Sequence, residues 1–131
     1  MVSIKKIIGF LFLSFILVNC DWDNKDSIIL EPKVFSNHIN KQNIQLVDVR
    51  TPKEHSKEYI QGAININYYS KNFADSLLLL NREKAVYVFC RSGKRSNKSV
   101  TKFKKIGFDT IYQLKGGFLN WKKEGFKIVT K

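Results

Sequence analysis

The sequence predicts an α/β domain in which helices cover both faces of a mostly parallel sheet. Short apolar runs alternate along the chain with segments that show helical spacing, as in α/β proteins. One of these runs, residues 85–89, leads straight into Cys90 and is typical of a strand buried on both faces. With 131 residues, of which 44% are hydrophobic, the chain is long enough for one domain with its own core.

The first half of the predicted domain contains two helices and two strands. Residues 32–40 form a predicted helix, because a proline suits its first position and the apolar residues that follow share one side. Residues 44–49 predict the first buried strand. Thr51 then caps a short helix whose first turn holds Glu54, where the helix dipole favours a carboxylate. Residues 63–66 predict a short strand.

The second half continues the alternation of strands and helices. The spacing predicts a helix over 72–82, with the leucine run 77–80 widening its apolar side and packing in the core. After the buried strand, a helix over 96–106 is predicted to place apolar residues inward and lysines outward. A strand over 110–114 follows, and then a last helix whose Trp121 is predicted to pack against the sheet.

The loop after the buried strand carries the chemistry that the sequence predicts. Cys90 stands at the carboxyl end of that strand and beside a helix N-terminus, where ligands of open α/β sheets gather. The helix dipole and the cations Arg91, Lys94 and Arg95 favour the thiolate form of Cys90, which is the nucleophile. Gly93 can adopt a positive φ, which lets successive backbone N–H groups point at one centre. The loop therefore predicts a cradle for a small anion attached to Cys90; a buried structural cysteine before an exposed basic turn is the alternative.

Three motifs in the chain resemble those of one enzyme family. Cys90–Ser96 reads Cys-Arg-Ser-Gly-Lys-Arg-Ser and resembles the C-x-x-G-x-R-[ST] active-site loop of the rhodanese family of sulfurtransferases. Val47–Glu54 is similar to its D-V-R-x-P-x-E segment, and Leu114–Gly125 resembles its closing L-x-G-G-x-x-x-W-x-x-x-G. The resemblance implies a rhodanese-like fold and a thiosulfate sulfurtransferase-like enzyme without a cofactor. A small anionic donor would leave its sulfane sulfur as a Cys90 persulfide, and a thiophilic acceptor, cyanide or a thiol, would remove it.

The resemblance also implies a role for each matching residue. Cys90 would be the catalytic nucleophile, and Asp48, Arg50 and Glu54 would give structural support near the loop. The substrate would be bound by the rest of the loop, Arg91, Ser92, Gly93, Lys94, Arg95 and Ser96. The chain departs from the family at residues 58–59, where Glu58 and Tyr59 replace the usual glycine and histidine. Because that histidine is normally structural, the expected effect is on local loop geometry, and Tyr59 keeps a hydroxyl that can form hydrogen bonds.

The N-terminal residues predict export and a lipid anchor. Two lysines precede an apolar run over 7–18, which is too short to span a bilayer and fits a signal peptide. Leu17–Cys20 resembles a bacterial lipobox, which predicts a lipoprotein-type signal peptide over 1–19 and lipidation of Cys20. Residues 20–27 then form a short linker, and 28–131 form the domain. The predicted protein is a membrane-anchored lipoprotein on the periplasmic or cell-envelope side; a signal peptide cut nearby or an uncleaved anchor are the alternatives.

Charge and cysteine content exclude several classes of function. The chain has 23 basic and 11 acidic residues, but its predicted export and the lack of a binding motif argue against a nucleic-acid partner. The excess of basic residues fits solvated surfaces, attraction to anionic lipids and steering of anionic substrates. With Cys20 lipidated, Cys90 is the only free thiol, so no disulfide forms. His38 and His55 lack the spacing of a metal pair and are predicted to be surface residues, so no metal is expected.

Two other functions compete with sulfur transfer. The domain is alternatively a non-catalytic sulfur-carrier or binding module, because the same cradle serves both roles. A cysteine phosphatase or arsenate reductase is less favoured. Related phosphatases place one more residue between the cysteine and the arginine, which makes a wider cradle for a tetrahedral phosphate. The shorter Arg91–Lys94 spacer of this chain fits a single sulfur better.

Overall fold

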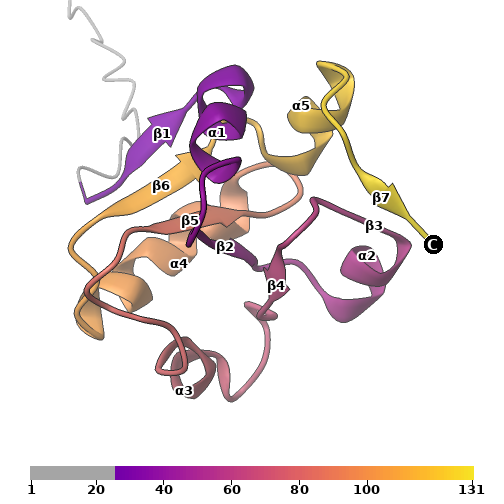
Figure 1. The fold of residues 1–131 in the computed structure, drawn as a ribbon. Coiled ribbons are helices and arrows are strands. Elements are labelled where there is room, and N and C mark those ends of the chain that lie inside the picture. The colour runs from indigo at the N-terminus through magenta and orange to yellow at the C-terminus, as the bar shows by residue number, and fades with distance from the viewer. Residues whose placement is uncertain (1–25) are drawn as a thin grey trace, which may run out of the picture.

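A computed structural model describes residues 26–131 and has a five-stranded parallel sheet at its centre (Figure 1). The strand order is β1-β6-β5-β2-β4, so the strand before Cys90 lies in the middle. The strands are β1 (Ile28–Leu30), β2 (Gln45–Asp48), β4 (Ile64–Asn65), β5 (Val86–Phe89) and β6 (Ile111–Leu114). Because all of them run parallel, their carboxyl ends meet at one edge of the sheet.

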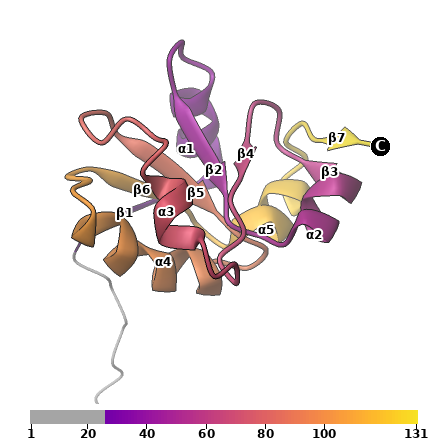
Figure 2. The same cartoon turned by 90° about the horizontal axis from the view of Figure 1, so that it is seen from below.

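Helices cover both faces of this sheet, as the sequence predicts (Figure 2). On one face lie α3 (Phe73–Leu77) and α4 (Lys94–Lys105), and on the other lie α1 (Pro32–Ile39) and α5 (Gly117–Lys123). A short helix, α2 (Pro52–Lys57), leads into β3 (Glu58–Tyr59), which pairs antiparallel with β7 (Val129–Thr130). This α/β architecture confirms the predicted fold class.

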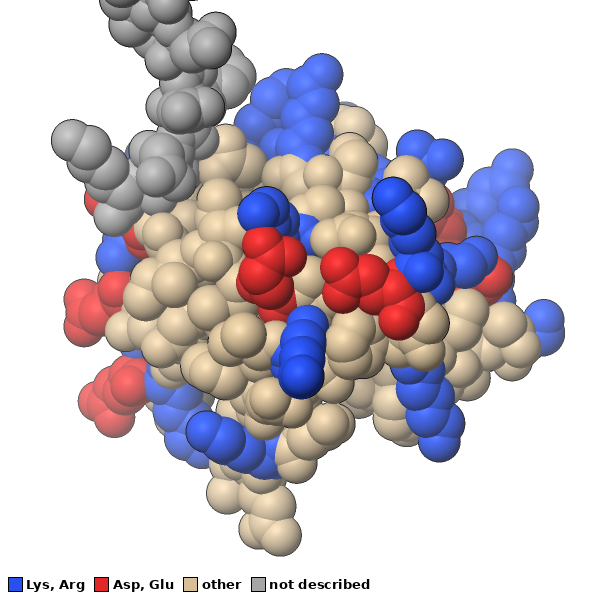
Figure 3. All heavy atoms as spheres, turned by 90° about the horizontal axis from the view of Figure 1, so that it is seen from above, with Lys and Arg blue, Asp and Glu red and all other residues tan. Residues whose placement is uncertain are grey.

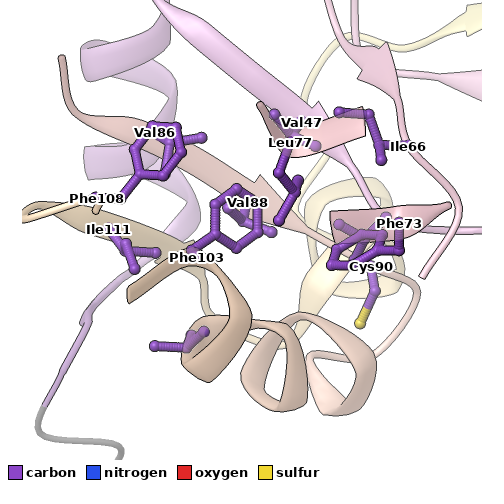
Figure 4. Packing of buried hydrophobic residues seen from close by; sticks show 12 residues of the cluster. Val47, Ile66, Phe73, Leu77, Val86, Val88, Cys90, Phe103, Phe108 and Ile111 are labelled. Atoms are coloured by element: carbon purple, nitrogen blue, oxygen red, sulfur yellow. The ribbon is translucent and has the colours of Figure 1, made fainter. Parts of the chain in front are cut away.

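Each face of the sheet has its own buried cluster, because side chains alternate along every strand. Val86, Val88 and Cys90 point toward α3 and α4, where Phe73 and Phe103 are fully buried (Figure 4). The intervening β5 residues, Tyr87 and Phe89, point the other way and pack in the cluster that includes α1 and α5. The alternation therefore fixes the side of the sheet on which the Cys90 thiol lies.

Most predicted elements are present, with small shifts at their ends. The structure confirms the helix predicted over 32–40 and the strands predicted over 44–49, 63–66 and 110–114. The helix predicted from Ser96 begins two residues earlier, at Lys94, because the loop is already helical there. The sequence missed β1, β3 and β7, which have only two or three residues each and are too short for a clear pattern.

The prediction for residues 72–82 is wrong in part. The helix α3 ends at Leu77, and Leu78 and Leu79 are 52% and 88% exposed rather than in the core. Beyond Leu77 the chain continues in tight turns, in which the N–H groups of Leu79 and Leu80 donate to carbonyls three residues back. These turns direct the middle of the leucine run to solvent, and Leu80 packs against the core again.

Within residues 26–131, no helix has the length and apolar character needed to cross a membrane. The predicted signal peptide and the predicted lipidation site Cys20 lie outside the described residues, so they stay predictions.

Candidate active site

Cys90 directly follows the central strand β5, and its side chain is buried against α4. The thiol is 1% exposed, and the described part of the chain holds no other cysteine. The backbone N–H of Gly93 donates to Cys90 Sγ over 3.1 Å, and the Ser96 hydroxyl lies 3.6 Å from the sulfur. The sulfur therefore accepts one backbone N–H, and its own S–H donates to the Ser96 hydroxyl.

Gly93 gives the loop its curl. Its φ is 99°, in the left-handed region that other residues rarely adopt, and it is the residue that caps α4. Its carbonyl accepts hydrogen bonds from the Ser96 hydroxyl and from the Asn97 N–H, both at 3.0 Å. These bonds close the turn and leave the Gly93 N–H, one of the several N–H groups that the predicted cradle requires, facing the sulfur.

The helix α5 holds the loop from the opposite side. The N–H groups of Phe118 and Leu119 donate to the carbonyls of Cys90 and Arg91 over 2.8 and 3.0 Å. A Cβ atom on Gly117 would lie 2.6 Å from both carbonyl oxygens, so only glycine allows this close approach. The sequence indicates a turn at Gly117, but that glycine's contact with the loop is a tertiary feature that no local pattern shows.

Arg95 leaves the loop toward α2 rather than toward the sulfur. Its guanidinium binds both carboxylate oxygens of Glu54, at 2.7 and 2.8 Å. Glu54 also forms a capping box with Thr51 at the start of α2. The hydrogen bonds from Arg95, and then those from Thr51, lower the pKa of Glu54 from its usual 4.5 to about 2, against the effect of burial. The pair therefore links α2 to the start of α4 beside the candidate site.

A buried charge cluster ties β2 to its neighbours below the site. The fully buried Asp48 carboxylate accepts hydrogen bonds from the backbone and side chain of Arg50 and is joined to His55 Nδ1 at 2.9 Å. The Arg50 guanidinium also donates to the Glu58 carbonyl and lies 4.1 Å from the centre of the Phe118 ring. Because these contacts join β2, α2, β3 and α5, Asp48 and Arg50 lie where structural support is predicted.

The prediction that both histidines are surface residues is wrong in part, because both are only partly exposed and each contacts a partner in the fold. His55 is bound to the buried Asp48, and its ring lies 4.9 Å from the Tyr59 ring. His38 Nδ1 is 3.1 Å from the Tyr87 hydroxyl on the face covered by α1. Both rings are part of the packed structure, which the spacing of two isolated histidines does not indicate. Among residues 26–131 there is no group of three or more side chains suited to a metal ion.

The remaining cations of the loop point into two different clefts. Arg91 lines a cleft of about 270 Å³ together with Phe118 and Lys122. Ser92, Gly93 and Lys94 line another cleft, of about 260 Å³, on the side of β6. The structure thus separates Arg91 from Lys94, although the sequence predicts both at one binding site.

On the one face that Figure 3 shows, the basic side chains do not gather in one area. On the face drawn in Figure 3, Lys and Arg are scattered across a mostly uncharged surface, with acidic groups near several of them. Lys115 pairs with Glu31, and Lys122 pairs with Glu58. Arg91 and Lys94 make no ion pair with any described residue, so their charges are available to a ligand.

Comparison with known proteins agrees with these features. The family model of the rhodanese-like domain matches residues 31–124. The tRNA uridine(34) hydroxylase of Pelagibacter ubique is 32% identical over 101 residues, which are 76% of this chain and 34% of that protein. The uncharacterized protein YqhL of Bacillus subtilis is 37% identical over 87 residues, which are 66% of this chain and 65% of that protein. The chain spans only about a third of the length of the hydroxylase relatives.

Solved structures show the same fold. A rhodanese-related protein from Thermoplasma volcanium has a TM-score of 0.69 and 26% identity, with 79% of this chain and 99% of that chain covered. A rhodanese-like domain protein from Staphylococcus aureus has a TM-score of 0.66 and 29% identity, with the same coverage of 79% and 99%. The fold of the described residues is thus the fold of other small proteins whose whole solved chain consists of this one domain.

Replacing Glu54 by glutamine should destabilise the protein in a pH-dependent way. Because the pKa of Glu54 is about 2 in the fold and 4.5 ordinarily, its stabilising effect is present above pH 4.5 and is lost as the pH falls toward 2. At pH 7 the expected loss is on the order of 1 kcal/mol, since the ion pair is partly exposed and screened. Urea unfolding of both proteins between pH 7 and pH 3 checks this. If the difference in unfolding free energy between the two proteins is the same at pH 7 and at pH 3, the prediction is wrong.

Replacing Gly117 by alanine should be far more damaging than replacing Gly62 by alanine. Both glycines have positive φ, which costs a residue with a side chain about 1–2 kcal/mol. Only at Gly117 would the new methyl group also meet two carbonyl oxygens, which adds about 1–3 kcal/mol of steric strain. Unfolding free energies from urea titration test the difference. Equal losses in the two variants would show that the approach of α5 to the Cys90 loop is not tight.

Proposed function

Since the chain belongs to the rhodanese-like domain family, we propose that it is a sulfurtransferase that moves a sulfane sulfur through a persulfide on Cys90. The observation that carries this proposal is the setting of Cys90 Sγ, which follows the central strand and accepts the Gly93 N–H at 3.1 Å. A backbone donor held in this way stabilises negative charge on sulfur, as oxyanion-hole donors do on oxygen.

The first half-reaction loads the sulfur. The Cys90 thiolate attacks the outer sulfur of a donor such as thiosulfate, and a new S–S bond forms to Sγ. The S–S bond of thiosulfate breaks, and sulfite leaves with the electron pair. The negative charge that was on Cys90 Sγ is then on the outer sulfur of the persulfide. No proton needs to move, because a thiolate is converted directly into a persulfide anion.

The second half-reaction removes the sulfur. Cyanide, or a thiolate in the cell, attacks the outer sulfur and takes it, and the electron pair of the breaking bond returns to Cys90 Sγ. The products are thiocyanate or an acceptor persulfide, and the Cys90 thiolate is regenerated. The Gly93 N–H faces the sulfur, which suits it to stabilise each anion in turn, whereas the Ser96 hydroxyl donates to the Gly93 carbonyl and holds the turn that directs this N–H.

The charges around the loop divide into two groups with different expected roles. Arg95 is held by Glu54, so it fixes the shape of the loop and contributes a partly neutralised charge. Arg91 and Lys94 are exposed and make no ion pair with a described residue, so we assign them to the binding of anionic substrates. Their positive charge would attract a doubly charged donor toward the buried thiol.

A phosphatase or arsenate reductase activity is the less favoured alternative. Only four residues separate Cys90 from Arg95, and Arg95 is turned toward Glu54 rather than toward the sulfur. A tetrahedral oxyanion needs a ring of donors around several oxygens, whereas here one backbone N–H, that of Gly93, is directed at one sulfur atom. The geometry therefore favours transfer of a single sulfur.

A sulfur-carrier or binding module is the second candidate, and the burial of the thiol favours it. Cys90 is 1% exposed, which restricts the approach of a donor or acceptor to its sulfur. Slow turnover of thiosulfate combined with fast transfer to one protein acceptor would identify this role. For either role we also propose export and lipid anchoring at Cys20, which the lipobox-like Leu17–Cys20 supports.

Replacing Cys90 by serine should abolish sulfur transfer, because serine cannot form a persulfide. With thiosulfate as donor and cyanide as acceptor, we expect thiocyanate formation to fall by at least about a thousandfold. A colorimetric thiocyanate assay on both proteins measures this, and their unfolding midpoints show whether the variant is folded. Substantial thiocyanate formation by a folded Cys90→Ser protein would contradict the proposal. Release of phosphate from an aryl phosphate by the wild type would favour the phosphatase instead.

A further inference from the structure

A cleft beside the Cys90 loop is larger than thiosulfate requires. It lies between the first turns of α4 and the carboxyl ends of β1 and β6, with a volume of about 260 Å³. Its lining includes one side of the loop and a mostly apolar floor; the residues that bear on the argument are Ser92, Gly93, Lys94, Lys98, Gln113 and Leu114. Gly93 lines the cleft, and its N–H donates to Cys90 Sγ. One residue therefore separates the cleft from the reacting sulfur.

Two lysines on the wall of the cleft have no counter-charge among the described residues. Lys94 and Lys98 are one helical turn apart on α4, so they share a face of that helix. Both are exposed, and neither makes an ion pair with any described residue. The third lysine of the cleft, Lys115, is bound by Glu31 at 2.6 Å. The cleft thus presents two uncommitted positive charges.

The position of Lys94, the first residue of α4, is unfavourable for the helix itself, and Lys98 follows in the next turn. The first turn of a helix carries the positive end of its dipole, where acidic side chains are stabilising and basic ones are not. The first turn of α4 nevertheless has no acidic residue, and it starts with Lys94 and Arg95. Arg95 is compensated by Glu54, whereas Lys94 and Lys98 receive no such compensation from a described residue. An anionic ligand in the cleft would supply the missing negative charge.

The floor and the size of the cleft indicate what kind of anion it accepts. Ile29, which is 44% exposed, provides apolar surface over the buried Leu114, and the buried Gln113 amide donates to Ser27 and Asn97. Thiosulfate has no carbon and is much smaller than a cleft of about 260 Å³. An organic molecule with a short carbon stem and a carboxylate matches both the apolar floor and the two lysines.

We infer that this cleft is the subsite for the sulfur acceptor and that it selects a small thiol bearing a carboxylate. This inference rests on the proposed sulfurtransferase function and adds the class of the acceptor. The carboxylate binds Lys94 and Lys98, and the acceptor's thiolate attacks the outer sulfur of the Cys90 persulfide. A bond forms between the acceptor's sulfur and the sulfane sulfur. The bond from the sulfane sulfur to Cys90 Sγ breaks, and its electron pair stays on Sγ. The two lysines offset the repulsion between an anionic acceptor and the persulfide anion.

Three thiols that differ only in the charge of their terminal group test this inference. They are 3-mercaptopropionate, 2-mercaptoethanol and cysteamine, which share an ethyl stem and carry a negative, a neutral and a positive group. Protein loaded with thiosulfate is mixed with each thiol, and the rate of persulfide discharge is followed. The same rates are measured for Lys98→Glu and for the control Lys105→Glu, which makes the same charge change near the other end of α4. Comparing each variant with the wild type for one thiol cancels the intrinsic reactivity of that thiol.

The Lys98→Glu variant should lower the discharge rate with 3-mercaptopropionate by about tenfold, as expected for reversal of a charge at a partly exposed binding site. The rate with 2-mercaptoethanol should stay unchanged and that with cysteamine should rise. Thiosulfate should still load the variant, and Lys105→Glu should behave as the wild type with all three thiols. Equal changes with the three thiols, or equal changes in the two variants, would overturn the acceptor subsite. A wild type that thiosulfate does not load would overturn the proposed function, and this inference with it.

Discussion

The candidate site depends on the backbone contact between α5 and the outer side of the Cys90 loop. Two N–H groups of α5 bind the carbonyls of Cys90 and Arg91, and Gly117 allows the close approach that these bonds require. Because the carbonyls are held outward, the Gly93 N–H on the inner side is free to face the sulfur. A loop that had to satisfy its own carbonyls would offer fewer donors to a bound anion. The direction of the Gly93 N–H toward the sulfur thus depends on the hydrogen bonds that α5 makes to the outer side of the loop.

The charged residues around this contact stabilise the loop without touching the sulfur. Asp48 is buried with Arg50 and His55, and the Arg50 guanidinium lies against the Phe118 ring of α5. The pair of Arg95 and Glu54 joins α4 to α2 on the other side. These ion pairs anchor α5 and α2, the two helices on either side of the loop. Arg91 and the lysines of α4 keep positive charges to which an anionic substrate can bind. Structural and substrate-binding cations are therefore different residues in this fold.

The sequence is enough to predict the fold class and the position of the thiol, because both depend on local signals. The apolar run before Cys90, the glycine in the loop and the capping residues around Thr51 each determine the structure of a few neighbouring residues. What the sequence could not predict depends on residues that are distant along the chain. The contact of Gly117 with the loop and the bond from His55 to Asp48 exist only once the elements have packed. The exposure of Leu79 was not predicted either, since α3 ends at Leu77 although the apolar run continues.

The most direct test of this account is the intact mass of the protein before and after incubation with thiosulfate. Sulfur transfer through Cys90 predicts a gain of one sulfur atom, located on the peptide that contains Cys90 and removed again by cyanide. The free thiol of Cys90 should disappear and reappear in step with that mass. An unchanged mass in a folded protein whose Cys90 is reduced would contradict the account, because a loop built to stabilise a persulfide anion would then have failed to accept one.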